Sequence, residues 1–288
     1  ILPTPSASSE LNSLSQARVN KELAQKITSW VPPPFTKAKE ARLKSERQWY
    51  LNMAFYFGQQ NVMFKGGSSA VDRSLQLYTP PAPYYRSRPV INKIRPYMRS
   101  EMAKLTAQKP SAYIVPASSD DRDMYAANAG EQIWDSIYRW KKFPNTLRRA
   151  VFWTSITGNG FIKSFWDETK IDPESDLPGD ICFSPVTPFH LYVPDLKEEE
   201  LEDQPFVIHA QLRNADQLSA LYKQPINFQK SSSDMLEDSF LNIMGVQQWE
   251  KNKNVLVLET WIRPNVCKDY PAGGMCVIAG NQIVHMTE

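Results

Sequence analysis

Apolar residues recur every three or four positions through the first 160 residues, a spacing that predicts α-helices with one apolar face. Val19, Leu23, Ile27 and Trp30 follow this spacing, and the prolines at 32–34 are expected to end their helix. Residues 1–9 show no such pattern and are expected to form an unstructured arm. Further helices are predicted over residues 36–57 with Thr36 as the cap, 92–108, 121–143, and from Asn145 or Thr146 to Gly158.

Two of these helices have a periodic apolar face that we expect to be buried. In the helix at 92–108 this face consists of Ile94, Met98, Met102 and Leu105. In the helix at 121–143 it consists of Ala126, Ala129 or Gly130, Ile133, Ile137 and Trp140. A short edge strand is predicted between the two helices, from Tyr113 to Pro116.

Beyond Gly160 the apolar residues alternate with polar ones, which predicts β-strands. A single helix capped by Asn214 interrupts them, and Gly280-Asn281 is expected to turn a terminal hairpin. The order of helices first and strands later predicts an α+β fold with a mostly antiparallel β region. The strands are predicted at residues 161–166, 180–186, 189–193, 206–212, 255–262 and 274–286.

This pattern divides the chain into three parts: an N-terminal arm and helix at 1–35, a helical part at 36–160, and a β-rich part at 161–288. With 288 residues, 42% of them hydrophobic, the chain can bury a substantial core. Three cysteines at wide spacings do not suit a disulfide-stapled scaffold. No run of eighteen apolar residues occurs, so we expect no membrane association.

The charge of the chain is strongly divided along the sequence. Residues 1–163 hold 24 Lys and Arg against 11 Asp and Glu, whereas residues 164–288 hold 9 against 20. The formal net charge of +2 is therefore the sum of a net charge of +13 in the first part (24 − 11) and of −11 in the second (9 − 20). Such a chain favours packing of its own halves, or of one copy on the next, over simple binding of a polyanion.

Few residues suggest catalysis. Gly158-Asn159-Gly160 follows a helix and precedes a strand, the reverse of a phosphate-binding loop, and is better explained as a helix end. Cys267, Cys276 and His285 lack the close ligand pair of a zinc site. Glu168-x-Lys170 is a pattern of some metal-dependent nucleases, but a second carboxylate is not evident. We therefore assign no catalytic residue, no metal ligand and no cofactor.

Four segments, taken in order, resemble the portal proteins of tailed bacteriophages, as found in podoviruses and some siphoviruses. They are RPVINKIRPYMRSEMAKLTAQKP (88–110), PASSDDRDMYAANAGEQIWDSIY (116–138), GNGFIKSFWD (158–167) and GDICFSPVTPFHLYVPD (179–195). The resemblance rests on their order and spacing over roughly residues 40–285.

The resemblance implies a non-enzymatic ring protein, commonly of twelve copies, at one vertex of the capsid. Through such a ring double-stranded DNA is packaged and ejected without sequence specificity. The partners implied are further copies of the chain, the major capsid protein, terminase and a head–tail adaptor. The protein is expected in the virion after assembly in the host cytoplasm. The chain resembles the wing part of the family, and we expect it to continue beyond residue 288 into the stem, clip and crown.

The charge division and the resemblance together give a hypothesis for subunit contact. A basic set is expected to face either a neighbouring subunit or DNA, and an acidic set is its expected counter-face. Two alternative functions stay open: a metal-dependent nuclease or other DNA-processing enzyme, and a generic head–tail adaptor. The basic set is Arg86, Arg88, Lys93, Arg95, Arg99, Lys104 and Lys109, and the acidic set is Glu198, Glu199, Glu200, Glu202 and Asp203.

Overall fold

The computed structural model describes residues 25–64, 77–110, 113–171, 178–198, 200–222, 224–226, 254–268, 270–280 and 282–287, without the side chains of residues 168–171 and 178. These residues form helices and antiparallel sheets, so the predicted α+β class is confirmed. Contacts divide the chain into two compact units. Unit 1 comprises residues 1–47, 64–77 and 189–288, and unit 2 comprises residues 48–63 and 78–188. Strands 161–171 and 178–186 thus belong to the same unit as the central helices.

Unit 1 contains an antiparallel sheet of five strands in the order β5-β6-β7-β8-β9. The strands are β5 (Leu191–Tyr192), β6 (Phe206–Asn214), β7 (Asn254–Ile262), β8 (Gly274–Ala279) and β9 (Gln282–Met286). The predicted strand at 189–193 is shorter than expected, because the 3-10 turn η1 (Pro188–His190) occupies its start. A second 3-10 turn, η2 (Leu201–Asp203), precedes β6. Helix α6 (Ala215–Tyr222) lies between β6 and β7 in the chain.

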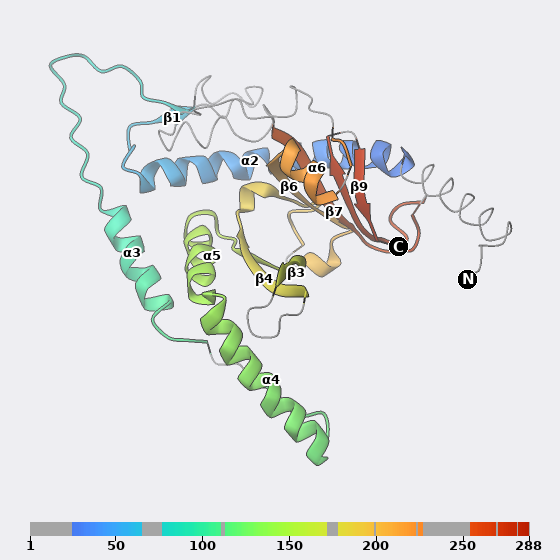
Figure 1. Ribbon diagram of the computed structural model, residues 1–288. Coiled ribbons are helices and arrows are strands. Elements are labelled where there is room, and N and C mark those ends of the chain that lie inside the picture. Colours follow the sequence, from blue (N-terminus) through green and yellow to red (C-terminus); the bar gives the residue numbers. More distant parts are fainter. Residues whose placement is uncertain are drawn as a thin grey trace. The chain divides into compact units, whose positions relative to one another are not determined.

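The sheet of unit 1 is covered on both faces. Because side chains alternate along a strand, β7 sends Leu256 and Leu258 to one face and Val255 and Val257 to the other. The first face packs against residues 25–30, which are helical, and the start of α2 (Pro32–Tyr56), with Phe35 stacked edge-on to Tyr192. The second face packs against α6 (Figure 1). Asn214 caps α6 as predicted, accepting hydrogen bonds from the backbone of Asp216 and Gln217.

Unit 2 consists of helices and a two-stranded ribbon. It contains the C-terminal part of α2, from residue 48. Its ribbon consists of the strands β3 and β4, residues 161–171 and 178–186, which pair antiparallel. The short strands β1 (Met63–Phe64) and β2 (Leu77–Tyr78) form a further two-stranded sheet, of which Met63 and Tyr78 are assigned to unit 2 and Phe64 and Leu77 to unit 1. The remaining elements of unit 2 are α3 (Ile94–Leu105), α4 (Asp121–Trp140), α5 (Phe143–Thr157), β3 (Phe161–Ile171) and β4 (Pro178–Val186).

Aromatic contacts hold unit 2 together. Phe143, at the start of α5, contacts Trp134 and Tyr138 of α4 at 5.5 and 5.8 Å between ring centroids, and Phe183 of β4 at 5.2 Å. Gly158 ends α5 with a φ of 86°, in the left-handed region, as the sequence predicts. These contacts fix α4, α5 and the ribbon within one unit.

The prediction for the start of α2 is wrong. The preceding helix does break at Val31, but α2 begins at Pro32, so the prolines lie in its first turn instead of outside it. Proline is tolerated there because the first turn has no partner for its amide groups. Thr36 does not cap the helix, since its hydroxyl donates back to the carbonyl of Pro32.

Four further predictions near α3 and α4 are wrong. Residues 113–116 form no strand, and α4 ends at Trp140 before a separate α5 begins at Phe143. No residue of α3 is buried, although its apolar stripe was expected to be. The face of α4 around Ile133 and Trp140 is exposed as well, and Ala127 is the buried residue of that helix.

Candidate interaction surface

Exposed apolar side chains are concentrated in unit 2. Among the described residues, Leu196, Leu201 and Leu221 are the exposed large apolar side chains of unit 1, and all the others belong to unit 2. The most exposed rings of unit 2, at 58–101% of their full accessible area, are Tyr84, Tyr85, Tyr97, Tyr113, Tyr125, Trp140 and Trp166. At about 150–250 Å² for each aromatic side chain, these seven represent on the order of 1,000 Å² of surface available for burial. The seven rings come from separate segments of unit 2, namely residues 84–85, α3, residue 113, α4 and β3, so this area is a sum over several surfaces of the unit.

Helix α3 is held at its N-terminal end by Asn92. The Asn92 amide donates to the carbonyl of Tyr56 at 2.9 Å, and its side-chain oxygen accepts from the backbone of Arg95 at 3.2 Å. Gly58, with a φ of 88°, passes so close that a Cβ there would lie 3.3 Å from the Asn92 amide nitrogen. This anchor fixes the start of α3, while the faces that carry Ile94, Tyr97 and Leu105 stay exposed.

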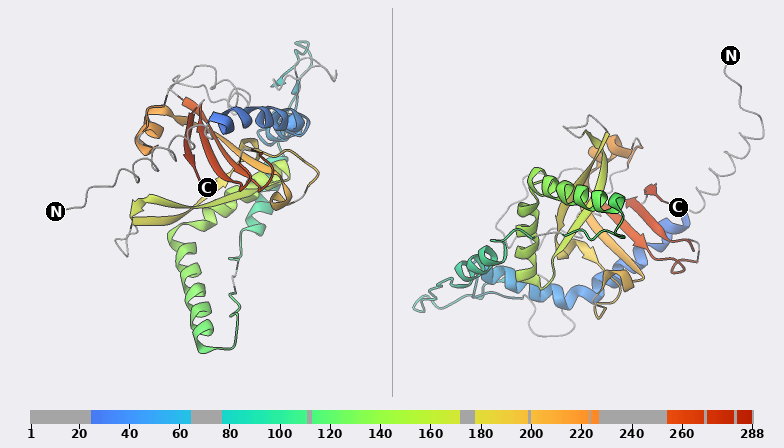
Figure 2. Two further views of the ribbon diagram at one scale, coloured as in Figure 1. Left: turned by 90° about the vertical axis from the view of Figure 1, so that its right-hand side faces the viewer. Right: turned by 90° about the horizontal axis from the view of Figure 1, so that it is seen from below.

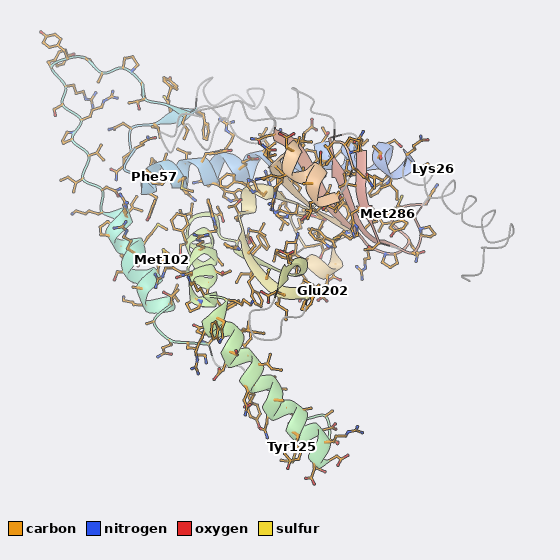
Figure 3. All side chains as sticks on the ribbon, in the orientation of Figure 1. Lys26, Phe57, Met102, Tyr125, Glu202 and Met286 are labelled. Carbon is orange, nitrogen blue, oxygen red and sulfur yellow. The ribbon has the colours of Figure 1, made fainter. Side chains whose placement is uncertain are left out.

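Helix α4 packs through one face against the segment that precedes it (Figure 2). The backbone amide of Ile114 donates to Glu131, and a Cβ on Gly130 would lie 2.6 Å from the Ile114 side chain. Lys109 pairs with Asp135 farther along the same face. The opposite face is apolar and exposed, with Ile133 in its middle and Tyr125 near the N-terminal end of the helix (Figure 3).

The predicted basic residues all belong to unit 2. Arg86, Arg88 and Lys93 precede α3, Lys109 follows it, and the other three lie within it. Lys109 is engaged with Asp135, and Lys104 with Glu101 at 3.0 Å. Arg95 lies 5.8 Å over the ring of Tyr56. Within the part of the chain that the structure describes, four of the set make no ion pair and are exposed: Arg86, Lys93, Arg95 and Arg99.

The predicted acidic residues lie in unit 1, on a loop that we call the acidic loop, residues 195–204. Gln204 is 3% exposed, and its amide closes the base of the loop through two hydrogen bonds with the backbone of Asp195, at 3.2 and 2.6 Å. Glu199 lies outside the described residues. Asp203 approaches Arg263 at 3.8 Å, and the remaining predicted acidic residues, Glu198, Glu200 and Glu202, are exposed (Figure 3).

A second loop, in unit 2, contains Arg86 and Arg88 of the basic set, but its two tyrosines were not among the predicted site residues. The chain from 79 to 93 forms neither helix nor strand (Figure 1). Within it the Arg88 guanidinium donates to the carbonyl of Pro80 at 3.0 Å, and the backbone amide of Arg86 donates to that of Pro83 at 2.9 Å. We call residues 80–88 the tyrosine loop, because Tyr84 and Tyr85 form its tip. The dense run of prolines beside two tyrosines was the available signal.

The ribbon supplies the second carboxylate that the nuclease hypothesis lacked. Asp167, the residue before Glu168 in the sequence, lies on β3 and pairs in register with Asp180 of β4. Lys141, at the end of α4, forms an ion pair with Asp180. The side chains of Glu168 and Lys170 lie outside the described residues.

The cysteines and histidines considered for zinc binding are distributed along the β half. Cys267 and Cys276 are buried, and burial raises the pKa of the Cys276 thiol to about 11. His285 is exposed on β9. Among the described residues, no three His, Cys, Asp or Glu side chains are grouped closely enough to hold a metal ion. No helix in the described ranges is long and apolar enough to cross a membrane.

Comparison with known proteins gives no family assignment. Neither the protein-family models nor the curated protein sequences contain a match to this chain. The features that suggest a function are the exposed apolar residues of unit 2 and the charged residues of the basic set and the acidic loop.

Proposed function

We propose that the chain is the wing part of a bacteriophage portal protein, which closes into a ring and forms the channel and platform for DNA packaging at one capsid vertex. The observation that carries this proposal is the exposed apolar surface of unit 2. The exposed rings provide about 1,000 Å² in total over several segments of the unit, and each partner buries about 800 Å² in one stable interface. A ring subunit needs two different interfaces, one on each side, and so exposes more apolar surface than a monomer.

The division of charge supports association between copies. The residues of the basic set that make no ion pair lie in unit 2, and the exposed glutamates of the acidic loop lie in unit 1. Two copies of one chain can therefore present opposite charges to each other, which increases the rate and the specificity of association. Head-to-tail contacts of this kind form closed rings when the rotation between copies is suitable.

Negative-stain electron microscopy of the purified chain tests the proposal directly. We expect rings with a central hole, together with a mass that falls as salt is raised. At 1 M salt the Debye length is about 3 Å, so contacts that depend on charge are screened. A monodisperse monomer at micromolar concentration and low salt would contradict the proposal.

Charge reversal distinguishes the two uses of the basic set. Arg95→Glu with Arg99→Glu is expected to abolish rings if these residues contact a neighbouring subunit. Intact rings that package DNA poorly would instead place the residues against DNA, whose phosphates attract cations without regard to sequence. Lys37→Glu is the matched control, because Lys37 is an exposed cation of α2 outside the basic set.

A metal-dependent nuclease is the second candidate, favoured by the pairing of Asp167 with Asp180 on neighbouring strands. Two carboxylates and a lysine at such a position suit a magnesium-assisted hydrolysis of phosphodiesters. Cleavage of plasmid DNA that requires Mg²⁺ and is lost in Glu168→Ala would establish this function. The absence of cleavage by the intact chain would remove it.

A further inference from the structure

The tyrosine loop has a preformed shape with an exposed tip. Two internal hydrogen bonds close it, and Pro80, Pro81 and Pro83 restrict its backbone. At the tip Tyr84 is fully exposed and Tyr85 is 78% exposed, with the two rings packed edge to face at 5.7 Å. Two adjacent aromatic rings held clear of their own chain are typical of residues that anchor an interface.

The acidic loop has the complementary composition and is also preformed. Gln204 closes its base through two hydrogen bonds with Asp195, and Glu199 within the loop lies outside the described residues. Beside its exposed glutamates it carries Leu196 and Leu201, which are 46% and 42% exposed. Exposed leucines and carboxylates on one loop complement two tyrosine rings followed by Arg86, an exposed cation for which the described residues show no ion pair.

We infer that the tyrosine loop of one copy docks on the acidic loop of the next copy in the ring. Tyr84 and Tyr85 cover the two leucines, and the Arg86 guanidinium pairs with a carboxylate of the acidic loop. Arg88 acts within its own loop, because its guanidinium is bonded to Pro80. This contact rests on the proposed function, since the ring supplies the second copy, and it specifies which two segments meet.

Cysteine cross-linking tests the contact in the full 288-residue chain. The double variant Tyr85→Cys with Leu201→Cys is expected to give a ladder of disulfide-linked oligomers after mild oxidation. The matched control is Tyr85→Cys with Leu221→Cys, because Leu221 is an exposed leucine of unit 1 outside the acidic loop. The natural cysteines Cys182, Cys267 and Cys276 are buried and should contribute little.

The cross-linking outcomes separate this inference from the proposed function. Rings with a ladder specific to the Leu201→Cys pair support the contact. Rings without a ladder above the Leu221→Cys control overturn the contact and leave the ring intact. Failure of the unaltered chain to form rings overturns the proposed function and the contact with it. A disulfide confined to the monomer would show that the loop docks on its own chain, which also overturns the inference.

Charge exchange provides an independent measurement by sedimentation at low salt. Arg86→Glu or Glu202→Arg alone is expected to weaken association about two- to five-fold for each contact, and the double variant to restore it. Tyr85→Ala is expected to weaken association more than tenfold, because aromatic anchors contribute most to an interface. If these variants leave association unchanged but Tyr84→Ala and Tyr85→Ala abolish binding of a fluorescent single-stranded oligonucleotide, the loop is a base-stacking surface and the inference fails.

Discussion

Arg42 allows a stringent test of the packing in unit 1. This arginine of α2 is 2% exposed, and its Nη1 donates to the carbonyl of Leu191 at 2.7 Å. Its Nε and Nη2 donate to one carboxylate oxygen of Glu46 at 3.4 and 3.3 Å. The guanidinium also lies 3.8 Å over the ring of Tyr192. One side chain thus joins α2 to β5 and neutralises a buried carboxylate.

Removal of Arg42 should be costly because it leaves charge behind. In Arg42→Ala the carboxylate of Glu46, a residue that is 7% exposed, loses its guanidinium partner, and the carbonyl of Leu191 loses its donor. Breaking a buried ion pair by removing one partner costs about 3–5 kcal/mol. The double variant Arg42→Met with Glu46→Leu should recover most of this loss, because neither charge of the buried pair is left without the other.

Urea unfolding followed by circular dichroism measures these differences. Lys104→Ala is the matched control, since Lys104 forms a comparable helical pair with Glu101 at 3.0 Å but with both side chains exposed. We expect no measurable change of midpoint in that control. Equal midpoints for Arg42→Ala and Lys104→Ala would refute the reasoning that burial, and not the ion pair itself, determines the cost.

Three further variants test local features. Burial and the nearby charges of His209 and Arg42 lower the pKa of His190 to about 4, against 6.5 in the unfolded chain, so stability is complete above pH 6.5. It should fall by about 3 kcal/mol as the pH drops towards 4, and His190→Gln should remove this slope in urea midpoints compared at pH 7.5 and 4.5. Asn92→Ala should cost about 1–2 kcal/mol by removing the α3 cap and the bond to Tyr56, with Asn159→Ala as a loop control; equal midpoints would argue against the anchor. Gly158→Ala should cost about 1 kcal/mol from its φ of 86° alone, because no atom lies within 4 Å of the new Cβ, and a larger loss would imply a steric clash.

The β-sheet of unit 1 was predicted well because its strands obey a local rule. Alternation in β6 and β7 places side chains on two faces, and both faces are buried by elements of the same unit. Gly158 and Asn214 were also predictable, because a left-handed glycine and a capping amide act on neighbouring residues in sequence.

The exposure of α3 and the choice of the buried face of α4 were not predictable from periodicity. Helix α4 has apolar residues on both sides, with Ala127 and Trp134 on one and Ile133 and Trp140 on the other. Periodicity identifies an amphipathic helix but does not specify which neighbour covers which side. Ile114 approaches Gly130, where the absence of a Cβ leaves room for it, and Phe143 contacts Trp134 on the same side.

The candidate surfaces were predicted in part. Charge counting identified the acidic and basic residues, but not which of them make ion pairs. The bond from Gln204 to Asp195 and that from Arg88 to Pro80 join residues eight or nine positions apart through irregular backbone. No periodic pattern predicts such bonds. They join the two ends of each charged stretch and so close it into a loop.

The ribbon of β3 and β4 has a consequence for how assembly can be observed. In the described part of the chain these two strands pair only with each other, so each has an outer edge whose backbone amides point away from the partner strand. Amides of this kind exchange their hydrogen with solvent rapidly unless another chain covers them. Slowed exchange at the outer edge of Phe161–Asp167 in the assembled state would therefore reveal a strand added from a neighbour, residue by residue.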